Sequence, residues 1–143
     1  MASPRLSSIL ERAGELSGKN AKIEFLQQNA NASLYVILRH MFDPSIKFML
    51  PEGEPPYRPF DGLEGEADSR LYQELRKLYL FTEGGHPTLN QVRREMLFIL
   101  LIESVAPGDA KMLLAMKDKQ PYPAKKGITK KLIEEAFPGL IPS

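Results

Sequence analysis

The sequence contains no cysteine and no tryptophan, and its only histidines are His40 and His86. Without cysteine the chain can form neither a disulfide framework nor a thiolate nucleophile. Any zinc site would have to be built from histidine and carboxylate ligands alone, and the spacing of the carboxylates indicates no such site. We therefore expect no metal or other cofactor.

The chain also lacks a long hydrophobic run. Its longest, residues 96–102, is far shorter than the about 20 apolar residues that span a bilayer. Residues 1–5 lead directly into an amphipathic pattern and contain no apolar core of a signal peptide. We expect a soluble, cytoplasmic protein that does not bind membranes, in the host cytoplasm if the chain is of phage origin.

Catalytic signatures are missing as well. The sequence has no G-x-x-x-x-G-K-[ST] or G-x-G-x-x-G loop, no H-E-x-x-H and no G-x-S-x-G. His40 falls at the end of an apolar helical pattern, which favours a packed or surface histidine. His86 lies between a glycine pair and a proline, which is typical of a turn. The sequence therefore predicts a protein that is not an enzyme.

What is present is an ordinary globular composition of 143 residues, 43% hydrophobic and 26% charged. This length predicts a single domain over residues 1–143. The net charge is only +1, but the charges are segregated. Residues 52–74 hold seven acidic residues against two arginines, whereas residues 111–131 hold seven lysines against one aspartate.

Apolar residues recur at helical spacing in most of the chain, which predicts an all-α bundle of about six or seven helices. The expected helices cover residues 4–17, 20–28, 32–42, 68–83, 89–105, 110–117 and 129–137. Ser3 and Pro4 are expected to start the first, and a capping box of Thr88 and Gln91 the fifth. The fifth helix is apolar almost all round after Glu95, which predicts a buried central helix.

Two segments do not follow the helical pattern. Residues 46–50 are short and apolar, and are compatible with a strand, a single turn or a buried extended piece. Residues 51–67 are acidic and rich in proline and glycine, which predicts a long loop crossing the single domain. Tyr57 and Phe60 are expected to be exposed aromatic side chains in this loop.

The strongest candidate site precedes the last helix, in residues 124–131. A helix start offers unpaired backbone N–H groups and a positive dipole end, and here four lysines surround it. Backbone donors would come from Gly127, Ile128 and Thr129, with the Thr129 hydroxyl, and charge from Lys125, Lys126, Lys130 and Lys131. This pattern indicates a phosphate site, and the alternative is a solvated lysine-rich turn before an ordinary helix.

A family resemblance supports the phosphate site. The order Gly127-Ile128-Thr129, then Leu132-Ile133, then residues 137–142 (Phe-Pro-Gly-Leu-Ile-Pro) resembles the end of the N-terminal DNA-binding domain in ATP-dependent DNA ligases of tailed phages. Residues 111–116 resemble the helix before this turn, and residues 18–22 the family's first interhelical loop.

In that family the domain is a helical bundle that grips the duplex backbone across the minor groove without reading sequence. The resemblance implies phosphate contact around residues 127–131 and at Lys19, and we add Lys119 to this candidate set. The K-x-D-G adenylation motif of ligases is missing. We therefore expect a freestanding relative of the accessory domain, of phage origin, and no nucleotidyl transfer.

The leading hypothesis is a non-enzymatic, sequence-nonspecific DNA-binding protein whose partner is duplex DNA, possibly nicked. A rival hypothesis is a module that docks on a host or phage protein through the acidic proline-rich loop, with Tyr57 and Phe60 as anchors. A third is a virion or assembly component that uses the helical bundle as a building block.

Overall fold

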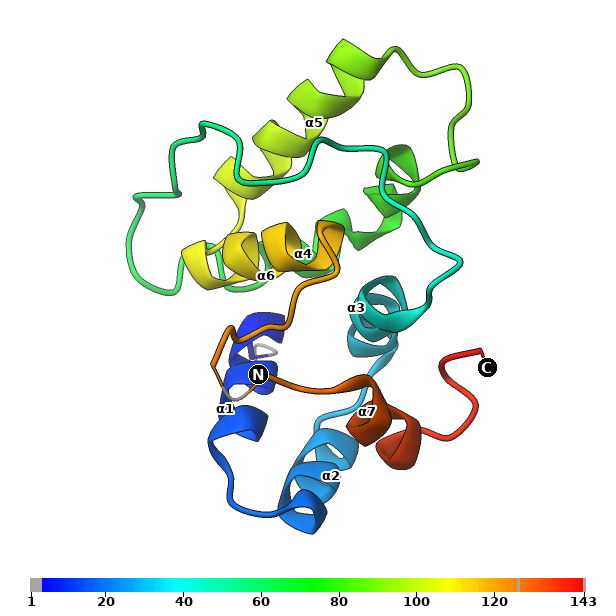
Figure 1. Ribbon diagram of the computed structural model, residues 1–143. Helices are drawn as coiled ribbons and strands as arrows, with labels where there is room; N and C mark the ends of the chain where they lie inside the picture. Colours follow the sequence, from blue (N-terminus) through cyan, green and yellow to red (C-terminus); the bar gives the residue numbers. More distant parts are fainter. Residues whose placement is uncertain (1–3, 126, 143) are drawn as a thin grey trace.

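Seven α-helices and one 3-10 helix make up the regular structure of residues 4–125 and 127–142, the part of the chain that the computed structural model describes (Figure 1). They are α1 (Leu6–Glu15), α2 (Lys19–Gln28), α3 (Ala32–Phe42), α4 (Arg70–Glu74), the 3-10 helix η1 (Leu75–Phe81), α5 (Gln91–Ser104), α6 (Pro107–Lys117) and α7 (Lys130–Ala136). The predicted all-α bundle is confirmed, and these described residues form no strand.

Side-chain caps explain where several helices begin. Asn31 Oδ1 accepts a hydrogen bond from Leu34 N at 2.8 Å to start α3, and Thr129 Oγ1 accepts one from Leu132 N at 3.2 Å to start α7. The capping box predicted for α5 is wrong. Its cap is Asn90, whose side chain satisfies two N–H groups of the first turn, so α5 begins two residues later than expected.

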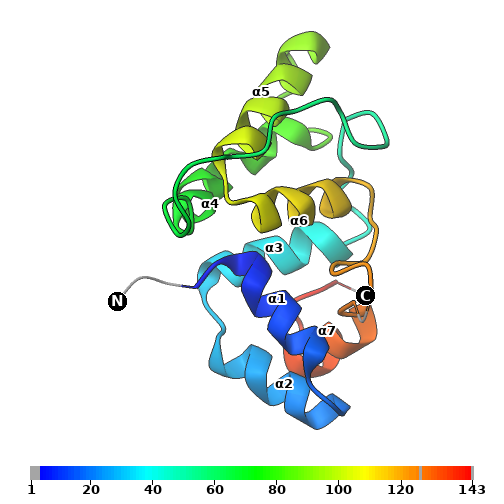
Figure 2. The same cartoon turned by 90° about the vertical axis from the view of Figure 1, so that its left-hand side faces the viewer.

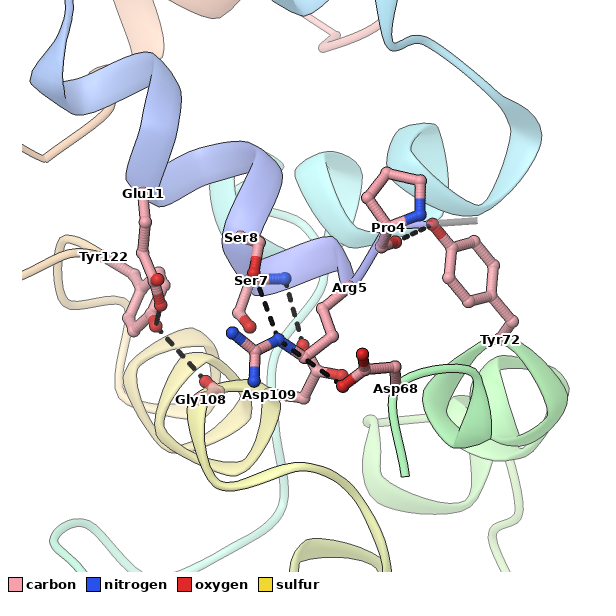
Figure 3. A network of polar contacts seen from close by, with 10 residues as sticks. All are labelled: Pro4, Arg5, Ser7, Ser8, Glu11, Asp68, Tyr72, Gly108, Asp109 and Tyr122. Atoms are coloured by element: carbon pink, nitrogen blue, oxygen red, sulfur yellow. Dashed lines mark hydrogen bonds and ion pairs between the residues drawn. The ribbon is translucent and has the colours of Figure 1, made fainter. Parts of the chain in front are cut away.

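The start of α1 is also different from the prediction. Ser3 lies outside the described residues, and Pro4 precedes the helix, which begins at Leu6. The cap comes from a distant residue, because Asp109 Oδ1 accepts a hydrogen bond from Ser7 N at 3.0 Å (Figure 3). Asp109 is completely buried, and this burial raises the pKa of its carboxyl.

The central helix is α6 and not α5. Helix α6 packs against α1, α3 and α5, and its Met112, Leu113 and Met116 are buried. Helix α5 lies at one end of the molecule and leaves Met96 and Leu100 more than half exposed (Figures 1 and 2). The expected buried position of the 89–105 helix is therefore wrong.

The expected helix over residues 68–83 is shorter and changes type. It divides into α4 and η1, and the tighter winding of a 3-10 helix turns Tyr79 outward, where half of it is exposed. The undecided segment 46–50 is an extended piece against the end of η1. Met49 N donates to Phe81 O at 2.7 Å, and Glu83 N donates to Lys47 O at 2.8 Å.

The predicted loop over residues 51–67 is confirmed, but it is tied to the bundle. Lys117 Nζ is buried and donates to Pro51 O at 2.8 Å and Gly53 O at 2.7 Å. Further along, Glu103 Oε2 accepts a hydrogen bond from Arg58 N at 2.9 Å. Proline and glycine prevent regular structure here, and side chains of α5 and α6 replace the missing backbone partners.

Helices α2 and α7 lie at the end of the molecule opposite α5, with α1, α3 and α6 between (Figures 1 and 2). One hydrophobic cluster continues through the bundle and includes Leu26 of α2, Phe98 of α5 and Ile133 of α7. Among the described residues, no helix combines the length and apolar character needed to cross a membrane.

Candidate nucleic-acid interface

A groove of about 320 Å³ lies between α2 and α7. We call it the α2–α7 groove, and its lining residues are Gly18, Lys19, Lys22, Gly127, Thr129, Lys131, Leu132 and Glu135. The two segments that form it are far apart in the chain, since Lys19 and Glu135 are 116 residues apart. The fold therefore brings together the turn before α7 and the early turn at Lys19, both of which were candidate sites.

Packing of α7 on α2 fixes the walls of this groove. Leu26, Leu132 and Ile133 are buried between the helices, and Gln27 Nε2 donates to Ala136 O at 2.9 Å. Gly18 precedes α2 with a φ of 88°, in the left-handed region that favours glycine. A turn of this kind reverses the chain between α1 and α2 and leaves Lys19 at the start of α2.

Three ammonium groups and one carboxylate line the α2–α7 groove. Lys131 is exposed and Lys22 is half-buried. Lys19 Nζ forms an ion pair with Glu135 Oε1 at 3.1 Å, and both side chains are partly open to solvent. Lys22 was not among the predicted residues, although its position one turn after Lys19 places both on one side of α2. The lining of the groove carries a net positive charge.

The turn before α7 contributes backbone atoms to the α2–α7 groove more than it contributes side chains. Ile128 is buried, so its side chain belongs to the core and only its backbone can face a ligand. A Cβ at Gly127 would lie 2.7 Å from Pro123 O and 2.9 Å from Pro121 Cβ, so glycine is required by the neighbouring chain. Thr129 is exposed, and its oxygen already accepts the capping hydrogen bond from Leu132 N.

The remaining predicted lysines have different surroundings. Lys125 and Lys130 are exposed beside the groove but do not line it, and Lys126 lies outside the described residues. Since α7 is only seven residues long, its dipole is small, and lysine side chains are the main source of positive charge here.

Lys119 is not part of the groove. Its Nζ donates to the carbonyl oxygen of His40, in the last turn of α3, at 2.6 Å. The same Nζ lies 5.6 Å from the centre of the Phe48 ring. Burial lowers the pKa of this ammonium. Its backbone has a φ of 54° and ends α6, with Gln120 N donating to Ala115 O at 2.9 Å. Lys119 thus joins α6 to α3.

The two histidines are packed against neighbouring rings. His40 Nδ1 is 2.8 Å from Val36 O, and burial lowers the pKa of its imidazole. The His86 ring stacks on Tyr79 at 6.4 Å between centroids. Both positions agree with the packed and turn roles expected from the sequence.

A second polar cluster joins α1 to α6 and to the turn before residue 127 (Figure 3). Tyr122 OH donates to Glu11 Oε2 and lies 3.3 Å from Gly108 O. Burial and the nearby Glu11 carboxylate raise the pKa of the Tyr122 phenol. These contacts hold the chain that leads from α6 to the α2–α7 groove.

Comparison with known proteins gives one family. Residues 9–121 match the model of a family described as a family of unknown function (DUF6433), which is most of the chain, so this protein belongs to that family. The matched range contains the α2 side of the α2–α7 groove and ends before its α7 side. No curated protein matches the sequence.

Proposed function

We propose that this member of the DUF6433 family is a non-enzymatic DNA-binding protein that holds backbone phosphates in the α2–α7 groove without reading base sequence. One observation carries the proposal. Lys19 and Lys22 from α2 and Lys131 from α7 line a single open groove. The resemblance to the ligase DNA-binding domain supports it, because that resemblance assigns phosphate contact to the two chain segments that form the groove.

The groove offers charge and a hydroxyl for a phosphate. Lys22 and Lys131 supply ammonium groups, and the Thr129 hydroxyl hydrogen can donate while its oxygen caps α7. Lys19 has to leave Glu135 to reach a phosphate. Ion pairs between solvent-exposed side chains contribute little to stability, so an anionic non-bridging phosphate oxygen can replace the carboxylate at small cost.

The composition of the groove favours binding without sequence preference. Its lining consists of lysines, small residues, Thr129, Leu132 and Glu135, with no aromatic ring or amide side chain among the lining residues. Base edges are usually read by arginine, asparagine or glutamine, and unpaired bases by stacking on aromatic rings. Affinity should therefore come from phosphate contacts and depend strongly on salt.

The test is a fluorescence anisotropy titration of the intact protein against a nicked duplex across a salt series. The groove variant is Lys19→Glu with Lys22→Glu and Lys131→Glu. A matched control carries the same change in net charge at exposed positions elsewhere, Lys47→Glu with Arg76→Glu and Lys111→Glu. Loss of three phosphate contacts should make the slope of log K against log salt shallower by about three.

We expect the groove variant to lose binding while the control keeps most of it, with equal circular dichroism spectra. Equal loss in both variants would show that only net charge matters and would refute a localised site. A salt-independent affinity, or no binding at low salt, would refute DNA binding itself. Repeating the titration with single-stranded and unnicked duplexes determines which form is preferred.

The rival hypothesis of docking through the acidic loop loses its expected anchors. Tyr57 is half-buried against the hydrophobic core and Phe60 is also half-buried, so the prediction that they are exposed is wrong. The backbone of the loop is fixed by Lys117 and Glu103. An observation that does favour a protein partner is found on the exposed face of α5.

A further inference from the structure

Helix α5 exposes a row of large apolar side chains. Val92 is 74% exposed, Met96 52% and Leu100 55%. These residues are four positions apart, so they lie on one face of the helix, and we call them the α5 stripe. Three large apolar side chains on one helix face form a patch, and the largest apolar patch on a monomer is often functional.

A cavity of about 200 Å³ opens beside the stripe, between η1 and α5. Its apolar walls are Leu80, Phe81, Leu97, Leu100 and Leu101. Leu100 belongs both to this cavity and to the α5 stripe, so the two form one continuous apolar surface. A helix lying along α5 could place one side chain in the cavity and the next ones over the stripe.

The two flanks of this surface carry opposite charges. Arg70 and Lys77 border the cavity with about half of each side chain exposed, and they share the largely buried Glu74 carboxylate. Arg93 continues the row of Leu97 and Leu100 by one turn and is exposed. The cavity side is therefore cationic.

On the opposite flank of α5 is the carboxylate of Glu95, whereas Glu103 lies at the C-terminal end of the stripe face, three residues after Leu100. Both are half-buried, and Glu103 accepts a hydrogen bond from the loop at Arg58 N. An occupant of the surface would meet cations along one edge only, so its carboxylates would have to lie toward the cavity.

The exposed area also limits the occupant. The three stripe side chains expose roughly 300 Å² of apolar surface, which is comparable with the largest apolar patch on a typical monomer. A stable dimer needs about 800 Å² from each partner. A single helix fits this area better than a second copy of the chain.

We propose that the α5 stripe and the adjoining cavity bind an amphipathic helix of a partner protein, whose apolar row is bordered by acidic side chains facing Arg70, Lys77 and Arg93. The surface shares no residue with the α2–α7 groove and lies at the other end of the molecule (Figures 1 and 2). The partner and DNA can therefore be bound at the same time.

The probes are two synthetic helical peptides with the same leucine row, one bordered by glutamates and the other by lysines. Binding to the full chain is measured by anisotropy and mapped by amide chemical shifts. The stripe variant is Met96→Gln with Leu100→Gln, and its matched control changes two exposed apolar residues elsewhere, Met49→Gln with Leu63→Gln. All four positions are exposed, so stability should be nearly unchanged.

We expect the glutamate peptide to bind about ten-fold more tightly than the lysine peptide, with shifts confined to α5 and η1. The stripe variant should bind it about ten-fold more weakly, whereas the control should bind normally. Arg93→Glu should remove the preference between the peptides.

Three results would overturn the proposal. The first is equal affinity for both peptides. The second is equal binding by the stripe variant and its control. The third is a dimer of the free protein in analytical ultracentrifugation that the stripe variant abolishes, because a second copy would then occupy the surface.

Discussion

Replacing Lys117 by methionine tests whether one buried cation holds the proline-rich segment against α6. Only 2% of the Lys117 side chain is exposed. Its Nζ donates to Pro51 O at 2.8 Å and Gly53 O at 2.7 Å, and pairs with Asp118 Oδ1 at 2.7 Å. Methionine keeps most of the apolar stem of lysine, with one heavy atom fewer, but removes all three contacts.

The expected loss of stability depends on the polar groups that lose the Lys117 ammonium as a partner. Hydrogen bonds to charged groups contribute about 1.5–3 kcal/mol each, and breaking a buried ion pair costs about 3–5 kcal/mol. Several of these losses are reduced here. Pro51 and Gly53 are exposed, so water can reach their carbonyls, and Asp118 Oδ2 keeps its bond from Gly53 N at 3.0 Å. We expect Lys117→Met to lower the free energy of unfolding by about 2–4 kcal/mol.

The assay is urea unfolding at neutral pH, combined with hydrogen exchange of the amides in residues 51–58. The variant should unfold at lower urea, and these amides should exchange faster before global unfolding. Asp118→Asn serves as the comparison, because it keeps the Lys117 contacts to the two carbonyls and should cost less. A loss below about 1 kcal/mol with unchanged exchange in the loop would refute the reasoning.

Glu135→Gln removes the carboxylate from the α2–α7 groove and frees Lys19, so DNA binding should become about two- to five-fold tighter at low salt, measured by anisotropy. Weaker binding would mean that Glu135 positions Lys19. Asn90→Ala should lower the free energy of unfolding in urea by about 1 kcal/mol, whereas Thr88→Ala should change it little, because Asn90 caps α5. Equal effects would contradict this assignment. Burial raises the pKa of Asp109 above its ordinary 3.8, so the folded protein holds the carboxyl proton more tightly than the unfolded chain does. The stability that this proton binding contributes is lost as pH rises through the folded pKa. Asp109→Asn should therefore gain stability relative to the parent as the pH rises above about 4 in urea titrations, and a difference independent of pH would contradict it.

The helices could be predicted because their signals are local. Apolar spacing acts within one or two turns, and α3 and α7 begin within one residue of the expected starts, where Asn31 and Thr129 cap them. The start of α1 could not be predicted, because its N–H partner Asp109 is 102 residues away. Thr88 failed as a cap because Asn90, two residues later, makes the same bonds to the first turn of α5.

The order of burial among the helices could not be read from apolarity alone. Helix α5 is apolar almost all round, which describes either a central helix or one that keeps an exposed face for a partner. The choice depends on which helices pack around it, and α6 occupies the centre. Spacing identifies the faces of a helix but not which of them another helix will cover.

The candidate site was predicted in part. The turn at residues 127–131 was identified from its glycine and lysines, and Lys19 from a family resemblance. Neither source assigned phosphate contact to Lys22, although it ends the segment 18–22 of the resemblance, and it becomes a lining residue only when α7 packs on α2. Lys119 was included because of its charge, yet its ammonium donates a hydrogen bond to the His40 carbonyl near the end of α3.

The basic C-terminal third of the chain therefore offers less charge to a ligand than its seven lysines imply. Lys117 and Lys119 have internal partners, and in the groove Lys19, which comes from α2 and not from this third, begins in an ion pair with Glu135. A groove with so few free ammonium groups should bind DNA weakly at physiological salt. If a partner that itself sits on DNA occupies the α5 stripe, binding at the groove becomes intramolecular and the effective concentration of DNA rises. Two weak sites at opposite ends of one small bundle can thus give a tight ternary complex although neither binary complex is tight.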